Sequence, residues 1–266
     1  MCTHCGCSSE DQVSIHNLQD GTHAHNHGAF HHHHTHEPSH KHQFEDKDAQ
    51  TKIINLEKKI LAANDEFASK NRKLFSEHQI KALNIMSSPG SGKTSLLEKS
   101  IGAMKHPEKV LVIEGDQASQ NDANRIKKAG CDVFQINTGK TCHIEAPMIN
   151  QALEASSLDS KDLVFIENVG NLVCPSLFDL GEAARVVLVS VTEGDDKPIK
   201  YPHMFQAADL VILNKIDLLP YLDTSIESFE SYLRKVNPNA PLICLSVKTE
   251  EGMGSWYDWL ATPRLA

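Results

Sequence analysis

Short apolar runs alternate with amphipathic stretches through most of the chain after Lys81. Seven runs rich in β-branched residues follow one another as ALNIMS, KVLVIE, DVFQI, DLVFIE, RVVLVSV, DLVILN and PLICLS. Helical patterns separate these runs, and strands that alternate with helices form a mostly parallel sheet with helices on both faces. The pattern therefore predicts an α/β fold of about seven strands, in which ligands bind at the carboxyl ends of the strands.

A separate apolar stripe precedes the first of these strands. Its residues are spaced as on one face of a helix: Ile53, Leu56, Ile60, Ala63, Phe67 and Leu74. We predict a helix over about residues 50–78 that packs on its own domain, with an intermolecular coiled coil as the alternative. Residues 1–48 hold few large apolar side chains and no periodicity, which predicts a disordered metal-binding tail ahead of a domain spanning 49–266.

Charge and hydropathy exclude several classes of partner. The 266 residues carry a formal net charge of −9 and have a pI of about 5.9, which argues against a nucleic-acid partner. No run reaches the roughly 18 apolar residues that a membrane span requires. The N-terminus, MCTHCGCSSEDQ, has no apolar region typical of a secretory signal. We therefore expect a cytoplasmic protein without a membrane partner.

The segment SSPGSGKTS at residues 87–95 matches the phosphate-loop motif G-x-x-x-x-G-K-S/T, with Ser87 in place of the first glycine. Backbone N–H groups of such a loop, with the N-terminus of the following helix, form an anion site. Lys93 is expected to reach the β- and γ-phosphates, and the Thr94 hydroxyl to bind Mg²⁺. A glycine-rich turn without a ligand is the alternative. The predicted nucleotide-binding residues here are Gly90, Ser91, Gly92, Lys93, Thr94 and Ser95.

Acidic residues follow the second and fourth predicted strands. Asp116 in VIEGDQ lies at the carboxyl end of the second predicted strand, where a carboxylate can bind Mg²⁺, and it is our first choice for the residue that positions the attacking water. Asp122 and Glu167 are the second choices for that role. Glu167 opens ENVGN, where it is expected to reach the Mg²⁺ shell while the Gly170 N–H contacts the γ-phosphate, so that hydrolysis releases the segment that follows. We predict Lys93, Asp116 and Glu167 as catalytic; a solvated aspartate and an ordinary turn are the alternatives.

The sixth predicted strand ends in LNKID, residues 213–217. Asn-Lys-x-Asp at a strand end indicates guanine, because the Asp217 carboxylate accepts hydrogen bonds from guanine N1–H and N2–H₂, and adenine lacks this pair of donors. Lys215 is expected along the base and ribose, and backbone groups after the last strand near guanine O6. The predicted base-binding residues are Asn214, Lys215, Asp217, Ser246, Val247 and Lys248. Five motif elements in this order predict a GTPase.

Cysteine and histidine are concentrated near the N-terminus. Most of the 16 histidines precede residue 43, and three of the seven cysteines are Cys2, Cys5 and Cys7. Three thiols joined by His4 can surround one soft ion; a redox-sensitive tail is the alternative. The histidine run suits Ni²⁺, Zn²⁺ or Cu²⁺ at several weak sites, with an expression tag as the alternative.

A second group of potential metal ligands lies inside the predicted domain. Cys142 and His143 are adjacent, and Cys174 lies four residues after the glycine of ENVG, on the segment expected to move with the γ-phosphate. Adjacent residues on an extended segment point opposite ways, so Cys142 and His143 need a turn or a second chain to share an ion. Three ligands are fewer than the four of a closed zinc site, so water or a second copy about a twofold axis would supply the rest. The alternative, a small buried hydrophobe, is the interpretation we prefer for Cys131 and Cys244.

These motifs together resemble the HypB family of GTPases, which insert nickel during maturation of nickel–iron hydrogenases. The resemblance rests on MCTHCGC, SSPGSGKT, VIEGDQ, GKTCHIEAP, ENVGNLVCP, LNKIDLLPY and SVKTEEG, and it spans nearly the whole chain. It implies a slow, Mg²⁺-dependent GTPase of the P-loop class that forms a homodimer in the GTP state. It also implies nickel at the N-terminal thiols and nickel or zinc at Cys142, His143 and Cys174. The implied partners are a small HypA-like nickel- and zinc-binding protein and the hydrogenase large subunit.

Two positions depart from what the resemblance implies. His4 stands where a small polar residue is expected, and Ser88 stands where related dimeric NTPases place a lysine that reaches across the dimer. The nearest alternative is the urease-maturation GTPase UreG, which is expected to carry a Cys-Pro-His motif that this sequence lacks. A nickel or zinc storage protein with a vestigial nucleotide fold is another alternative, against which the intact Lys93, Thr94 and Asp217 argue.

Overall fold

The computed structural model describes residues 47–116, 121–139 and 141–262. The thiols of Cys2, Cys5 and Cys7, the histidine run and the predicted disordered tail lie outside these residues. The chain divides into two compact units, Met1–Lys58 and Lys59–Ala266, and the second unit contains the whole sheet. The predicted boundary at residue 48 and the assignment of 49–266 as one GTPase domain stay predictions.

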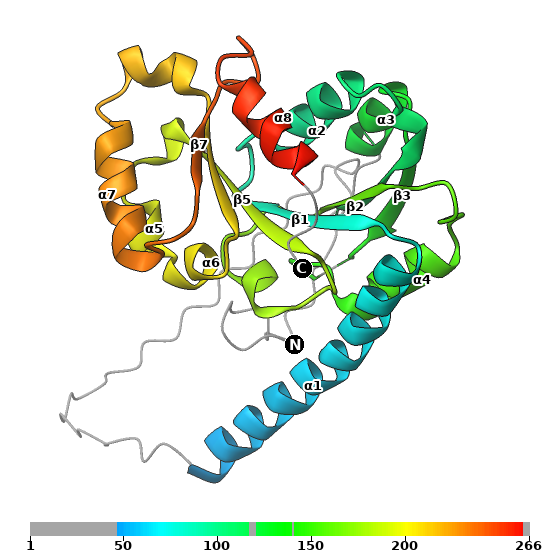
Figure 1. The fold of residues 1–266 in the computed structure, drawn as a ribbon. Coiled ribbons are helices and arrows are strands. Elements are labelled where there is room, and N and C mark those ends of the chain that lie inside the picture. The colour runs from blue at the N-terminus through cyan, green and yellow to red at the C-terminus, as the bar shows by residue number, and fades with distance from the viewer. Residues whose placement is uncertain (1–46, 117–120, 140, 263–266) are drawn as a thin grey trace, which may run out of the picture. The chain divides into compact units, whose positions relative to one another are not determined.

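A seven-stranded sheet forms the centre of the second unit (Figure 1). Its order is β3-β2-β4-β1-β5-β6-β7, and every neighbouring pair is parallel. All seven predicted runs form strands, which confirms the α/β fold class. The strands are β1 (Lys81–Ser87), β2 (Val110–Asp116), β3 (Asp132–Asn137), β4 (Leu163–Glu167), β5 (Ala184–Ser190), β6 (Leu210–Asn214) and β7 (Leu242–Cys244).

The inner strands are mostly apolar and are buried because helices cover both faces of the sheet. Every residue of β6 is buried, as is every residue of β1 after Lys81. β1 pairs with β4 on one side and with β5 on the other, where Leu83 aligns with Phe165 and with Ala184. The strand order therefore changes direction at β1, and the loop that follows β1 opens at the point where ligands of such sheets bind.

Successive residues of β1 point to opposite faces of the sheet and so enter different parts of the core. Leu83 and Ile85 pack with α2 (Lys93–Gly102), α3 (Asn121–Lys128) and α8 (Met253–Ala261). On the other face, Ala82 packs with α1 (Lys47–Glu77) and α4 (Ala146–Glu154), and Met86 packs with α6 (Pro202–Gln206) and α7 (Ile226–Val236). The short helix α5 (Lys197–Lys200) lies near α7 (Figure 1).

The leading helix α1 spans Lys47–Glu77, where we expected a helix over about 50–78. Within the second unit it packs on the α4 side of the sheet, and Ala68 and Phe75 are its most buried apolar residues. Ile60, Phe67 and Leu74 of the predicted stripe are half-buried against the same cluster. Neither α1 nor any other helix in the described part of the chain has an apolar stretch sufficient to cross a membrane.

Candidate functional site

The loop of residues 88–92, between β1 and α2, has the geometry of a phosphate site. Gly90 and Gly92 adopt left-handed conformations with φ of 75° and 102°, which favour glycine. Gly92 caps α2 without a side-chain hydrogen bond, so the first N–H groups of the helix stay available to an anion. Lys93 follows directly; its Nζ donates to Ser87 Oγ at 2.8 Å, and burial lowers the pKa of Lys93.

A cavity of about 560 Å³ opens over this loop. Gly170, the predicted γ-phosphate sensor, lies so close to the loop that a Cβ on it would come within 3.1 Å of the Pro89 backbone. The phosphate loop and the end of β4 therefore form one site. The cavity lining includes Gly90, Gly92, Lys93, Thr94, Ser95, Glu167 and Gly170.

Glu167 and Thr94 form the part of this cavity that suits a cation. Thr94 Oγ1 donates to Glu167 Oε1 at 2.7 Å, whereas Glu167 Oε2 is buried and receives no hydrogen bond from the described residues. Burial raises the pKa of Glu167 to about 6, although the nearby Lys93 acts in the opposite direction. A buried carboxylate oxygen without a donor, next to a hydroxyl, fits Mg²⁺, which binds oxygen ligands.

The other two predicted acids are Asp116 and Asp122. The structure gives the backbone position of Asp116 and a side-chain contact of Asp122. β2 ends at Asp116, whose backbone pairs with Asn137 of β3 at the carboxyl edge of the sheet. The roles predicted for the Asp116 side chain, in Mg²⁺ binding and in positioning water, stay predictions. Asp122 lines the phosphate cavity, and its carboxylate accepts a hydrogen bond from Arg125 at 3.3 Å.

The predicted base-binding residues surround a second cavity of about 640 Å³. Its lining includes Asn214, Lys215, Asp217, Val247 and Lys248. Lys215 also lines the phosphate cavity, and its Nζ donates to the Gly90 carbonyl at 2.8 Å. The two cavities share this side chain, as expected for a nucleotide whose base and phosphates bind together.

Asn214 and Ser246 form hydrogen bonds that hold other residues around this second cavity in place. The Asn214 amide donates to the Ser91 carbonyl at 2.8 Å and accepts from the Val247 N–H at 3.2 Å, so it ties the phosphate loop to the last loop. This amide also explains Gly92, where a Cβ would lie 2.7 Å from the Asn214 nitrogen. Ser246 is buried behind the base-binding residues, and its Oγ donates to an Asp217 oxygen at 2.6 Å. Ser246 therefore orients the carboxylate that is expected to bind guanine.

Glu193 supports the phosphate loop, and our motif analysis missed it. It ends the 3₁₀ turn η3 (Val191–Glu193) after β5, and its Oε1 accepts hydrogen bonds from Ser91 Oγ at 2.7 Å and from the Ser190 N–H at 2.8 Å. Its other oxygen accepts from Ser88 Oγ. The signal was present in the sequence as Ser-x-x-Glu, a capping box at residues 190–193. The Ser88 side chain, at the position where related dimeric NTPases place a lysine that reaches across the dimer, therefore forms this hydrogen bond within its own chain.

Cys142, His143 and Cys174 come together within one chain. Their ligand atoms all lie within 4.8 Å of one another. The two sulfurs are 2.9 Å apart, and His143 Nδ1 is 3.9 Å from the Cys142 sulfur. Hydrogen bonds between Thr138 and Thr141 close a turn just before Cys142, which provides the turn that we predicted as one option. Thiolates and an imidazole in this arrangement fit Zn²⁺ or Ni²⁺.

The surroundings of this cluster fix the imidazole. The His143 ring stacks on Phe178, with ring centroids 4.1 Å apart. Its Nε2 is buried and lies 3.4 Å from a Glu145 carboxylate oxygen, a distance typical of an ion pair but without hydrogen-bond geometry. Nδ1 is therefore the nitrogen that faces the sulfurs. Cys174 begins the 3₁₀ turn η2 (Cys174–Leu177) and is fully buried, whereas Cys142 is half-buried.

Asn168, which our sequence analysis did not single out, connects the two sites. It follows Glu167 and is buried, and its Oδ1 accepts hydrogen bonds from the N–H groups of Ile144 at 3.2 Å and Val169 at 3.0 Å. Ile144 is the residue after His143. Asn168 therefore holds the loop that carries Cys142 and His143 at the end of β4. The predicted contacts to Mg²⁺ and to the γ-phosphate lie at this same strand end.

The fold and the phosphate loop define a P-loop NTPase. The family model for the CobW/HypB/UreG nucleotide-binding domain matches residues 81–244. The chain is 48% identical over 218 residues to hydrogenase maturation factor HypB of Escherichia coli (strain K12), with 82% of this chain and 75% of that protein covered. The chain belongs to the HypB family of hydrogenase maturation factors, which confirms the predicted resemblance.

Solved structures of two relatives have the same fold. The crystal structure of HypB from Helicobacter pylori in complex with nickel superposes with a TM-score of 0.70 at 40% identity, covering 74% of this chain and 93% of that one. For HypB from Archaeoglobus fulgidus the TM-score is 0.71 at 42% identity, with 75% and 98% covered.

Proposed function

We propose that the protein hydrolyses GTP to GDP and phosphate with Mg²⁺, and that its nucleotide state controls binding and release of nickel for hydrogenase maturation. The observation that carries this proposal is the hydrogen bond from the Ile144 N–H to Asn168, which joins the thiol and imidazole cluster to the sensor end of β4. The nickel-bound relative from Helicobacter pylori supports nickel as the cargo.

The hydrolytic roles are assigned from the phosphate cavity. Lys93 would bind the β- and γ-phosphates, and the Gly170 N–H would bind the γ-phosphate from the opposite side. Thr94 and Glu167 would hold Mg²⁺, which when bound neutralises charge on the phosphate oxygens. Asp116 remains the first candidate for positioning the attacking water.

Specificity for guanine would come from Asp217 in the second cavity. Its carboxylate would accept two hydrogen bonds from the base, and Ser246, which donates to one of its oxygens, would hold it in the required orientation. Val247 and Lys248 lie at the cavity wall. The Val247 N–H is bound to Asn214, so the Lys248 backbone N–H is the group that would meet guanine O6.

Binding and release of nickel would depend on the segment between Gly170 and Cys174. With GTP bound, the Gly170 contact fixes the start of this segment, and with it the position of the Cys174 sulfur. Loss of the γ-phosphate frees the start of the segment, a ligand moves, and the ion is released. Zn²⁺ fits the same three ligands, and the N-terminal thiols with the histidine run would store further nickel.

The partners follow from the same role. In a GTP-state homodimer, a second copy about a twofold axis would add ligands to the three that one chain supplies. A HypA-like nickel and zinc protein and the hydrogenase large subunit would exchange nickel with this site. Urease maturation is a second candidate function, because a Helicobacter pylori relative that is 40% identical over 213 residues is named hydrogenase/urease maturation factor HypB.

The proposal is tested by nickel titration of the full chain carrying Cys→Ser substitutions at residues 2, 5 and 7. Thiolate-to-nickel charge-transfer absorption then reports the internal thiols and not the histidine run. We expect the affinity to differ by about 5- to 150-fold between GDP and a non-hydrolysable GTP analogue. Equal affinities in the two states would overturn nucleotide control.

Two cysteine variants, measured in the same way, show which thiols bind nickel. Cys174→Ala should abolish the absorption, while Cys244→Ala, which alters a cysteine outside the cluster, should leave both the absorption and the nucleotide effect intact. Absorption that survives Cys174→Ala would show that nickel binds elsewhere. Phosphate release from GTP, measured on the same preparations, tests the hydrolytic part separately.

A further inference from the structure

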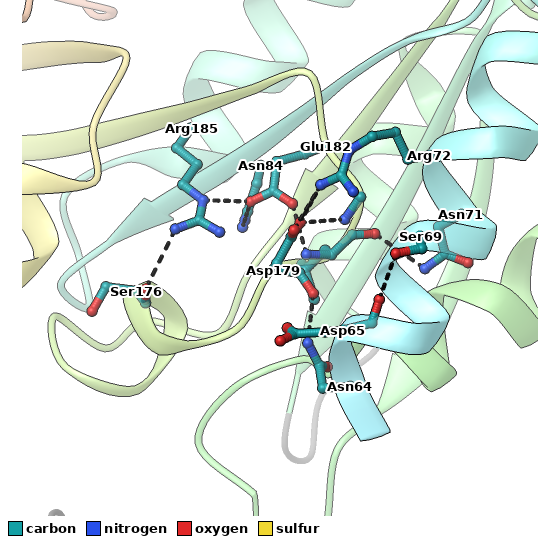
Figure 2. Close-up of polar contacts among 12 residues, drawn as sticks. Asn64, Asp65, Ser69, Asn71, Arg72, Asn84, Ser176, Asp179, Glu182 and Arg185 are labelled. Carbon is teal, nitrogen blue, oxygen red and sulfur yellow. Dashed lines mark hydrogen bonds and ion pairs between the residues drawn. The ribbon is translucent and has the colours of Figure 1, made fainter. Parts of the chain in front are cut away.

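The leading helix α1 contacts both of the segments that carry the internal metal ligands. The first segment runs from Cys142 to Ala146, and the second from Cys174 to Gly181. Figure 2 shows the α1 side chains Asn64, Asn71 and Arg72 facing the second segment around Asp179. These contacts lie entirely within the second compact unit.

Two asparagines of α1 each bind both segments. Asn64 accepts a hydrogen bond from the Ala146 N–H at 2.8 Å and donates to the Asp179 carbonyl at 2.7 Å. About two turns of helix further along, Asn71 donates to the carbonyls of Ala146 at 2.9 Å and Leu180 at 3.1 Å. Each side-chain amide therefore fixes the distance between the first segment and the second.

The energetics of a helix do not explain these asparagines. Asparagine is among the weaker helix formers, and burying an amide is costly unless it forms hydrogen bonds. Asn71 is fully buried and Asn64 is 3% exposed. Their hydrogen bonds to the two loops, which the helix itself does not require, offset that cost for both amide nitrogens and for Asn64 Oδ1. Asn71 Oδ1 is buried without a hydrogen-bond partner among the described residues.

The second segment lies against the backbone of α1. Gly181 has a φ of +86°, and a Cβ on it would lie 2.5 Å from the Ala68 carbonyl oxygen and 2.8 Å from the Arg72 nitrogen. Arg72 adds an outer contact, because its guanidinium binds both Asp179 carboxylate oxygens, at 2.9 and 2.6 Å. The close approach and the ion pair hold residues 179–181 to the helix.

The sheet holds the same segment from the other side. Glu182 accepts hydrogen bonds from the Leu180 N–H at 2.7 Å, from the Asn84 amide of β1 at 3.2 Å and from Arg185 at 2.7 Å (Figure 2). Asn84 in turn accepts from Asn168 at 3.3 Å. The far end of the segment is therefore anchored to both α1 and β1.

We propose that α1 is a bracket that sets the separation of the two ligand-bearing segments, with Asn64 and Asn71 as positioning residues for the cluster of Cys142, His143 and Cys174. The inference rests on the proposed function, in which this cluster binds nickel. It adds that the movement after hydrolysis is confined to residues 170–178, because residues 179–182 are fixed to the helix and the sheet.

The test uses the full chain with the three N-terminal Cys→Ser substitutions and adds one change in α1. Asn71→Leu, of similar size, removes the donor to both segments. Asn64→Asp keeps the acceptor for the Ala146 N–H, at the N-terminus of α4 where negative charge is favourable, and removes only the donor to Asp179. Ser69→Ala, on the exposed side of the same helix, is the control.

We expect Asn71→Leu to weaken nickel binding by about 10- to 100-fold, the usual effect of losing residues that orient metal ligands, and to change the charge-transfer spectrum. Asn64→Asp should have a smaller effect of the same sign, and Ser69→Ala none. GDP affinity should stay within about twofold of the parent in all three, because none of the α1 residues whose side chains the structure describes lines either nucleotide cavity.

Three results separate the possibilities. Unchanged nickel affinity in folded Asn71→Leu and Asn64→Asp would overturn the bracket. A parallel fall in nickel affinity, GDP affinity and melting temperature would also overturn it, since general destabilisation would then be the cause. Absorption that persists in Cys174→Ala would instead remove the proposed nickel site, whatever the α1 variants do.

Discussion

Replacing Glu167 by Gln should stabilise the protein in the absence of ligands while disabling the proposed Mg²⁺ site. Glu167 is 4% exposed, and Gln is nearly the same size. The Gln carbonyl can still accept the hydrogen bond from Thr94 Oγ1. The substitution therefore removes the negative charge and little else.

The magnitude follows from the pKa of this carboxyl. Burial raises it from 4.5 to about 6. A raised carboxyl pKa means that the folded state holds its proton more tightly than the unfolded state. The associated stability is fully present below pH 4.5 and is lost as the pH rises through 6. The loss amounts to about 2 kcal/mol at neutral pH, at 1.36 kcal/mol per pH unit. A Gln side chain does not ionise, so the Glu167→Gln variant does not lose this stability at neutral pH. The difference in free energy of unfolding corresponds to about 4–8 °C in melting temperature for a domain of this size.

The assay compares melting temperatures of the variant and the parent by circular dichroism from pH 5 to pH 8, with EDTA and no nucleotide. The advantage of the variant should grow through pH 6 and level off above pH 7. Adding Mg²⁺ with a GTP analogue should then stabilise the parent more than the variant. Glu250→Gln is the control, because hydrogen bonding to Lys99 lowers the pKa of that exposed carboxyl. Its small effect should have the opposite sign.

The reasoning about Glu167 would be refuted by a variant that melts at or below the parent at pH 8. It would equally be refuted by an advantage that does not change with pH. In the first case the charge is already compensated in the folded state, by Lys93 or another neighbour. In the second case the gain comes from packing and not from the buried charge.

Three further substitutions test other parts of the site. Lys93→Ala should lower single-turnover phosphate release by about 100-fold or more, because it removes the cation over the transferred phosphoryl group, while charge-transfer titration without nucleotide still detects nickel at the internal thiols. Asp217→Asn should weaken GDP binding by about 100-fold and admit xanthosine diphosphate, whose O2 accepts the hydrogen bond that the new amide donates; calorimetry measures both. Gly181→Ala should cost about 1–3 kcal/mol in urea unfolding because of its positive φ and the nearby α1 backbone, whereas Gly254→Ala, with open space around it, should cost nothing.

The sheet was predictable from the sequence because burial on both faces leaves most of the strands as short, largely apolar runs rich in β-branched residues. The face of α1 that packs on the rest of the second unit was harder to predict from the sequence. The positions that are buried in the structure, Asn64, Ala68, Asn71 and Phe75, follow one another at intervals of four, three and four residues. Two of them are asparagines and one is alanine. A search for large apolar residues therefore finds the neighbouring half-buried stripe instead.

The nucleotide residues were predictable because each motif lies within one loop, and its chemistry is local. The contacts of Glu193 with Ser91 and of Asn168 with Ile144 were missed because these partners lie in loops after other strands, which only the sheet brings together. The cluster of Cys142, His143 and Cys174 was predicted as a set of residues, with a turn within one chain and a second chain left as alternatives. The turn that aligns Cys142 with His143 depends on hydrogen bonds between two threonines, and threonine in sequence indicates no particular turn.

The position of β4 in the sheet accounts for the combination of a nucleotide switch with a metal cluster. β4 lies between β1, which leads into the phosphate loop, and β2, which lies next to β3. The loop after β4 therefore lies beside the phosphate loop at Gly170 and, through Cys174, reaches the cysteine and histidine that follow β3. In the proposed switch, this one short segment would contribute to both ligand sites. A conformation of it that favours GTP would then change the affinity for metal, and metal would change the affinity for GTP by the same factor. Had the second thiol followed β7, at the opposite edge of the sheet, no single segment would carry that coupling.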